Sequence, residues 1–442
     1  MKAGFAKVDI TPPLGSNLNG YYKERYATHV IAPLYASALA FSDGETTALA
    51  ISLDISEILM CDTDDIRQRI GRRCGVPFEA VFVHCIHTHT APVISEIRSF
   101  FKRDASYYEQ FCAKVCDSAV FAIADMREAT ASIARGKAEG ISFVRRFRMK
   151  DGGVATNPPM SLASEIASPI GTPDETVQLI KLVREGAADI AIVNFGTHPD
   201  TIGGTGICPD WPGFMRDTVE AALADEADGK GVRVIFFNGA QGDVNHLDKL
   251  GGVCRSGVDH SRHMGRVLAG AVLSVYTFTE EVDSKRVFYT QKWATVRFSK
   301  GTDAQVREAH DLNERYIKGE LPEGFVFNDI VMARKFIRNE LVPEVTELNV
   351  CCVGFGDVAF VGLPGEPFTE IGREIKSRSP FKMTLPCCNT NGSEGYFVTD
   401  DALSEDGYES SSSLFLPGVA GSMVDTALSA LGEAVERKET VI

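Results

Sequence analysis

Val81-Phe82-Val83-His84-Cys85-Ile86-His87-Thr88-His89-Thr90-Ala91-Pro92 is the stretch that best indicates how this chain folds. Its apolar first half is typical of a buried strand, and its Ala-Pro end marks the exit into a loop. Because side chains alternate along a strand, His87 and His89 point the same way and His84 lies out of phase. Such a pair is half of a metal or acid–base site, or two hydrogen-bonded loop histidines, and the segment alone leaves both open.

Composition narrows the class of protein. The chain has 442 residues, 44% of them hydrophobic, and a net charge of −15, which argues against a nucleic-acid partner or an anionic membrane. We find no signal-peptide pattern at the N-terminus and no stretch of about 18 apolar residues, so we expect no stable membrane insertion. The eleven cysteines show no CxxC spacing, which favours a reduced, cytoplasmic protein and argues against cysteine ligands for a metal.

Strand and helix signals alternate along the whole chain, and no linker divides it. The pattern predicts one large α/β domain over residues 1–442, with a mixed β-sheet flanked by helices. Ser106 is expected to cap a long helix. Gly301–Val342 reads as a helical insertion that could cover a site or be decoration. The other expected elements are strands at Ala36–Phe41, Thr47–Leu53, Val81–Ile86, Val177–Val183, Ala191–Phe195, Val232–Phe237, Val287–Phe298, Thr346–Phe355 and Val358–Leu363, and helices at Asp62–Cys74, Pro212–Ala224, Asp259–Val272, Pro367–Lys376 and Ser422–Lys438.

Polar clusters follow several apolar strands, at the position where α/β folds hold ligands. They contain His198, Asp243, His246, Glu366 and Tyr396. Each has a structural alternative, because His198 could cap a turn, Asp243 could hold a loop through backbone amides, Glu366 could favour a helix start, and Tyr396 could be a core aromatic. Taken together, imidazoles and a carboxylate at strand ends suit a catalytic zinc with an open water position.

These clusters resemble the neutral/alkaline non-lysosomal ceramidase family. His87–Pro92 is similar to the family's His-Thr-His-Ser-Gly-Pro motif, and Ala6–Gly15 matches its opening. Further similarities, in family order, are Ser52–Asp54, Asn194–Pro199, Asp210–Gly213, Asn238–Val244, Pro364–Glu366 and Gly407–Glu409. The resemblance covers nearly the whole chain, but the family's C-terminal immunoglobulin-like domain is expected to be absent at this length.

The resemblance implies a set of site residues. Zinc would be bound by His87, His198, Glu366 and Tyr396, and His89 would stay beside the metal and contact the substrate carbonyl or the attacking oxygen. It further implies that Arg145 or Arg146 polarises the substrate, with Val144 standing where the family has asparagine. The remaining assignments are Asn245 and Tyr408 for substrate binding and Asp243 and His246 for proton transfer or positioning of water.

One departure bears on the mechanism. The family's Gly-Asp-Val-Ser-Pro-Asn carries a proposed nucleophilic serine, and here the motif is Gly242-Asp243-Val244-Asn245-His246. Because an asparagine amide is no nucleophile, either zinc-activated water attacks directly or the protein is not a ceramidase-type amidase. The lost serine and the expected absence of the extra domain favour a smaller, more polar substrate than ceramide.

We therefore expect a zinc-dependent hydrolase that cleaves an amide-type C–N bond in a small-molecule substrate. A metal-dependent lactonase, esterase or carbohydrate-processing enzyme on the same scaffold is the first alternative. A non-catalytic zinc-binding homologue is the second, favoured by the missing serine. A homo-oligomer is compatible with the sequence.

Overall fold

The computed structural model describes the chain except for residues 97–99, 101, 253, 406 and 440–442. Its centre is a nine-stranded sheet in the order β14-β12-β11-β6-β1-β3-β4-β5, with β16 pairing with β6. The β12–β14 and β4–β5 pairs are parallel and the other pairs antiparallel, so the sheet is mixed, as expected. Its strands are β1 (Lys2–Asp9), β3 (Tyr35–Ser42), β4 (Thr47–Leu53), β5 (Val81–Cys85), β6 (Arg127–Lys137), β11 (Thr176–Arg184), β12 (Asp189–Phe195), β14 (Val232–Asn238) and β16 (Glu280–Val282).

A second sheet of four strands, in the order β17-β18-β19-β21, packs face to face on the first. Aromatic rings join the two layers, with Phe360 lying 5.3 Å from Phe237 and 6.3 Å from Phe82 between ring centroids. Cys351 and Cys352 face opposite sides of this sheet, since side chains alternate along a strand. The strands are β17 (Val287–Arg297), β18 (Val345–Phe355), β19 (Val358–Gly362) and β21 (Met383–Cys387).

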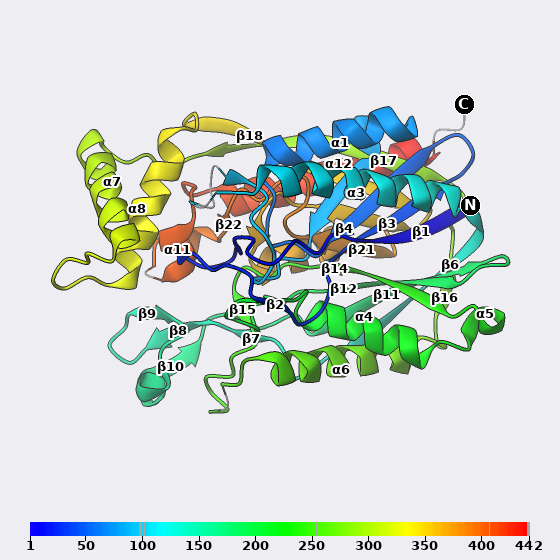
Figure 1. The fold of residues 1–442 in the computed structure, drawn as a ribbon. Coiled ribbons are helices and arrows are strands. Elements are labelled where there is room, and N and C mark those ends of the chain that lie inside the picture. The colour runs from blue at the N-terminus through cyan, green and yellow to red at the C-terminus, as the bar shows by residue number, and fades with distance from the viewer. Residues whose placement is uncertain (97–99, 101, 253, 406, 440–442) are drawn as a thin grey trace.

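Helices cover both outer faces of this pair of sheets. Those on the large sheet gather in two groups at the top and bottom of Figure 1. They are α1 (Met60–Cys74), α3 (Ala105–Ala124), α4 (Trp211–Ala222) and α6 (Val258–Val275), whereas α9 (Thr369–Arg378) and α12 (Val419–Glu439) cover the small sheet. Every helix among the described residues is too short or too polar to cross a bilayer.

The α/β class and most element positions agree with the sequence predictions, and three details differ. The single expected sheet is joined by a second sheet. Asp104, not Ser106, caps α3, because its carboxylate accepts hydrogen bonds from the amides of Ser106 and Tyr107. The helix expected from Pro367 begins at Thr369, since Pro367 pairs with Phe397 in a short ladder.

The remaining segments gather mainly at the end of the sandwich that holds the polar clusters. The expected helical segment Gly301–Val342 forms α7 (Asp303–Lys318) and α8 (Phe327–Glu340), which connect β17 to β18 and project at the left of Figure 1. Helix α8 packs on α11 (Tyr408–Ser412). The short elements are β2 (His29–Val30), η1 (Phe78–Ala80), β7 (Phe143–Val144), β8 (Arg146–Met149), β9 (Val154–Thr156), η2 (Met160–Glu165), β10 (Ile166–Pro169), β13 (Gly206–Ile207), α5 (Glu226–Gly229), β15 (Val244–Asn245), β20 (Glu366–Pro367), β22 (Tyr396–Phe397) and α10 (Asp400–Leu403).

Candidate metal centre

Two histidines converge although their strands lie near opposite edges of the large sheet, β5 at one edge and β12 next to the other. His87 follows β5 with a left-handed φ of 75°, and its Nδ1 lies 2.8 Å from the carbonyl oxygen of Ser56. His198 follows β12, and its Nδ1 lies 2.8 Å from the carbonyl oxygen of Gln241. A carbonyl can only accept, so each Nδ1 carries the proton and donates it. In the neutral imidazole each Nε2 atom then carries a lone pair, the arrangement typical of metal-binding histidines.

Glu366 and Tyr396 complete a cluster of four donor atoms. They stand opposite each other in the parallel ladder between β20 and β22. The Glu366 Oε2 atom lies 3.3 Å from Nε2 of His87 and 3.0 Å from Nε2 of His198, and Tyr396 Oη lies 3.3 Å from the same nitrogen of His198. Glu366 Oε2 is buried and makes no hydrogen bond of acceptable geometry to any described residue. Lone pairs therefore face one another here, which a bound cation would stabilise.

The separations can be tested against a tetrahedral zinc ion. Ligands at 2.0–2.1 Å from such an ion lie about 3.3 Å apart. Three contacts join the donor atoms of His87, His198, Glu366 and Tyr396, at distances of 3.0–3.3 Å. The donor set therefore fits zinc. A second grouping is also compatible with a metal, because ring nitrogens of His87, His89 and His198 all lie within 4.8 Å of one another.

His89 lies beside this cluster. Its ring centroid is 4.9 Å from that of His87 and 5.3 Å from that of Tyr21. Both ring nitrogens are shielded from solvent and hydrogen-bond to none of the described residues. Gly20 packs directly against it, with φ at 104° and no room for a Cβ, which would lie 2.6 Å from His89 Cα. An imidazole with two free nitrogens at this position can bind a substrate group or a metal.

The charges of the cluster are strongly coupled. Burial alone would raise the pKa of Glu366, but the neighbouring His87 and His198 imidazoles lower this pKa well below its ordinary value. Burial alone would lower the pKa of His87, and the Glu366 carboxylate raises it instead. Burial and the adjacent Arg145 guanidinium lower the pKa of His198. The carboxylate is thus held in its anionic, metal-binding form.

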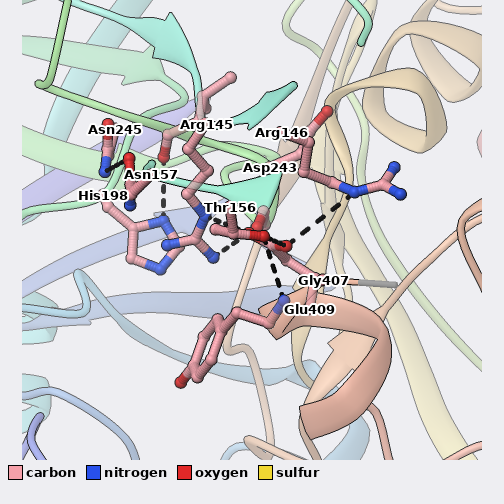
Figure 2. Close-up of polar contacts among 12 residues, drawn as sticks. Arg145, Arg146, Thr156, Asn157, His198, Asp243, Asn245, Gly407 and Glu409 are labelled. Atoms are coloured by element: carbon pink, nitrogen blue, oxygen red, sulfur yellow. Dashed lines mark hydrogen bonds and ion pairs between the residues drawn. The ribbon is translucent and has the colours of Figure 1, made fainter. Parts of the chain in front are cut away.

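Arg145 reaches the cluster, whereas Arg146 does not. The Arg145 Nη2 atom donates to Tyr396 Oη at 3.1 Å and to the carbonyl of Gly242 at 2.7 Å, and its Nε forms a buried ion pair with Glu409 at 2.6 Å. Arg146 points away from Arg145 in Figure 2 and pairs with Glu405 at 2.8 Å. Of the two arginines that the sequence could not separate, Arg145 is the one that contacts the candidate ligands.

Asp243, Asn245 and His246 lie around the cluster with partners of their own. The Asp243 carboxylate accepts hydrogen bonds from the amide and the hydroxyl of Thr369, at 2.7 and 2.6 Å, and so holds the start of α9. Asn245 donates to Asn157 Oδ1 at 3.2 Å (Figure 2). His246 forms an ion pair with Asp200 at 2.9 Å. Among the described residues, none of these three side chains forms a hydrogen bond or ion pair with the four donor atoms.

A cavity opens onto the cluster. Its inner part, of about 110 Å³, is lined by His87, Glu366, Arg334 and Arg338, among others. Its outer part, of about 760 Å³, is lined by Asp200, by Phe327 of α8 and by other residues of the surrounding loops and helices. His89, Tyr396 and Tyr408 line both parts, so the two parts adjoin at these side chains. The candidate ligands therefore stand in the smaller cavity, beside a larger one whose wall includes several tyrosines and Phe327.

Several motif residues hold the backbone instead. His84 Nδ1 donates to the carbonyl of Cys388 and its Nε2 accepts from the amide of Asn238, so its ring is buried and neutral, and burial lowers its pKa to about 3. Asp54 makes a buried, bidentate pair with Arg216 at 2.8 and 2.6 Å. Asp210 caps α4. These contacts fix the strand ends from which His87 and His198 emerge.

Sequence reasoning missed the residues that form much of the pocket wall. Arg334 and Arg338 come from α8, and Tyr21 and Tyr22 from the loop after β1. No motif marks them, since they are ordinary polar and aromatic residues far from the histidines in sequence. Asp200 carried a usable signal, because it follows His198 by two residues at a strand end.

Comparisons with known proteins identify solved structures of similar fold. No family model matches the chain, and no curated protein sequence matches it. Among solved structures, a neutral ceramidase from Pseudomonas aeruginosa superposes with a TM-score of 0.75 and 17% identity, over 98% of this chain and 74% of the other. A structure described as ceramidase complexed with C2 gives a TM-score of 0.75 and 15% identity, over 100% of this chain and 76% of the other. The chain therefore has a ceramidase-like fold over nearly its whole length, as its motifs led us to expect.

Proposed function

We propose that the protein is a zinc-dependent hydrolase that cleaves an amide-type C–N bond in a small or moderately sized substrate. The observation that carries the proposal is the buried convergence of His87, His198, Glu366 and Tyr396 beside an open cavity. The likeness to two structures that are named ceramidases supports a hydrolase. A cytoplasmic location stays a prediction of the sequence.

The residues around the cluster suit this chemistry. When bound, zinc would polarise a carbonyl oxygen and lower the pKa of a water molecule to about 7. His89 faces the same cavity with unpartnered ring nitrogens and is assigned to the substrate carbonyl. Arg145 orients the Tyr396 phenol through its hydrogen bond. Asp200 lines the cavity and pairs with His246, so proton transfer is assigned to this pair.

The proposal accounts for the missing serine. The side chain of Asn245 donates a hydrogen bond to Asn157, and its Oδ1 accepts one from the amide of Leu247 at 3.0 Å. Its amide therefore positions the loop that carries His246. Direct attack by water is then the route that remains for an amide substrate, and Asp243 keeps α9 and Glu366 in place.

Metal analysis and a substrate panel test the proposal together. The purified protein should contain about one zinc per chain, and His87→Ala should lose zinc and hydrolysis in parallel, while His310→Ala, at an exposed position on α7, should keep both. Protein that contains no transition metal after expression with added zinc would refute the zinc assignment. Faster turnover of esters or lactones than of matched amides would favour the first alternative, and full zinc without turnover would favour a binding protein.

A further inference from the structure

Two arginines of α8 enter the inner pocket. Arg334 and Arg338 are one helical turn apart and therefore lie on the same face of the helix. Both line the inner pocket together with His87 and Glu366. Arg334 is held rigidly, since its Nε donates to Asn313 Oδ1 at 3.0 Å and its guanidinium lies over the ring of Tyr22 at 5.1 Å.

The Arg338 side chain has no counter-charge of its own. Within the part of the chain that the structure describes, its guanidinium forms no ion pair, and its Nε is buried without a hydrogen-bond partner. The Arg338 side chain is half-buried, and its shielded Nε without a partner is unfavourable, so an anion that pairs with the guanidinium would stabilise it.

The acidic groups of the same pocket do not supply the anionic partner that Arg338 lacks. Glu366 and Glu57 both line the inner pocket. Glu57 accepts a hydrogen bond from Asn19 Nδ2 at 3.0 Å, and Glu366 belongs to the proposed metal ligands. A divalent cation held by the four donor atoms would give the inner pocket an excess of positive charge, which a substrate anion would balance.

We propose that the substrate carries a carboxylate a few bonds from the scissile amide, as an N-acyl amino acid does, and that Arg338 and Arg334 bind this carboxylate. This inference rests on the proposed amide hydrolysis and names its substrate class. The inner pocket of about 110 Å³ leaves little space between the arginines and the cluster, whereas the outer part of about 760 Å³, with its aromatic wall, takes the acyl group. Hydrolysis adds water across the C–N bond, giving a carboxylic acid and a free amino acid without any redox change.

Paired substrates test this assignment. With the zinc-loaded protein, N-lauroylglycine should be hydrolysed with at least about tenfold higher kcat/KM than N-lauroylglycinamide, which differs only by its neutral end group. Arg338→Gln should raise KM for the carboxylate substrate about 10- to 100-fold and leave kcat/KM for the amide within about twofold. Arg338→Lys keeps the positive charge but loses the planar guanidinium that binds a carboxylate through two hydrogen bonds. Its KM for the carboxylate substrate should therefore lie between those of the wild type and Arg338→Gln. Arg307→Gln removes an exposed arginine from α7 and should leave kcat/KM unchanged for both substrates.

The outcomes separate this inference from the proposed function. If the wild type hydrolyses both substrates equally, or if Arg338→Gln weakens both equally, the carboxylate assignment is wrong and the amidase stands. If neither substrate is hydrolysed, the amidase proposal fails for these substrates, and calorimetric binding of N-lauroylglycine then decides the inference. Binding that Arg338→Gln weakens at least about tenfold supports the carboxylate site, and absent or unaffected binding overturns it.

Discussion

Glu366 and Tyr396 are directly opposed partners in a two-residue parallel ladder, and both side chains reach Nε2 of His198. The ladder joins two loops that are separated by α9 and β21 along the chain. A slip of one residue would turn one of the two side chains to the other face. Backbone pairing therefore sets the separation of the carboxylate and the phenol before any ion binds.

Substitution of Glu366 should separate metal binding from folding. Glu366→Gln keeps the shape of the side chain but removes the anionic ligand, so we expect a loss of zinc affinity of about 100-fold or more and a parallel loss of activity. Zinc content by elemental analysis and titration with a competing chelator measure the effect. Glu370→Gln, on the exposed face of α9, is the matched control. Retention of zinc by Glu366→Gln would remove Glu366 from the ligand set.

Gly20 should affect activity through the shape of the pocket. Gly20→Ala places a Cβ 2.6 Å from His89 Cα, so His89 must shift, and we expect kcat/KM to fall at least about tenfold with zinc content unchanged. Gly15 also has a left-handed φ, at 86°, but a Cβ there meets nothing within 4 Å. Both variants should lose about 1–2 kcal/mol of unfolding free energy through backbone strain. An equal loss of activity in Gly15→Ala would contradict the role of the His89 contact.

The buried Arg145–Glu409 pair should dominate stability at the site. Glu409→Gln leaves the Arg145 guanidinium buried without its counter-charge, and we expect the free energy of unfolding to fall by about 3–5 kcal/mol. Urea denaturation followed by circular dichroism measures this loss. Glu374→Gln breaks a half-exposed pair with Arg378 and should cost less than about 0.5 kcal/mol. Similar losses of unfolding free energy in the two variants would show that burial of the Arg145–Glu409 pair does not increase its contribution to stability.

His84 should make stability depend on pH. Burial lowers its folded-state pKa to about 3, whereas an unfolded chain titrates near 6.5, so only the unfolded state binds this proton between those values. Stability should therefore fall as pH decreases from about 6.5 to about 3, by at most about 1.4 kcal/mol per pH unit from this residue. His84→Gln should flatten the dependence measured by urea unfolding, and His263→Gln, at an exposed position, should not. An unchanged slope in His84→Gln would refute this assignment.

Sequence patterns predicted the parts of the site that sit where apolar strands end. His87, His198, Glu366 and Tyr396 each follow or enter a short strand, and the structure brings them together. The class of fold was predictable for the same reason, because long apolar strands alternate with amphipathic helices. The second sheet was not predictable, since β17–β19 have the same local pattern whether they extend the first sheet or pack on it.

Other features depend on contacts that no local pattern records. Arg145 and Arg146 are adjacent and both pair with Glu409, at 2.6 and 4.0 Å, and only the folded arrangement shows that Arg145 is the one that reaches Tyr396. Asp243 could equally be a proton carrier or a helix anchor until Thr369 is placed beside it. Strand β1 lacks a clear apolar alternation, and its pairing with β3 over eight residues defines it.

The ladder between β17 and β18 runs to Arg297 and Val345, and the helical hairpin α7–α8 leaves and returns at this last pair. Both ends of the hairpin are therefore already neighbours, and its length can change without disturbing the registered strands. The imidazoles and the carboxylate come from other parts of the chain. Under the proposed function, a change in the length or sequence of α7–α8 would alter one wall of the pocket and leave the four donor atoms in place, so exchange of this hairpin is a direct way to change substrate preference.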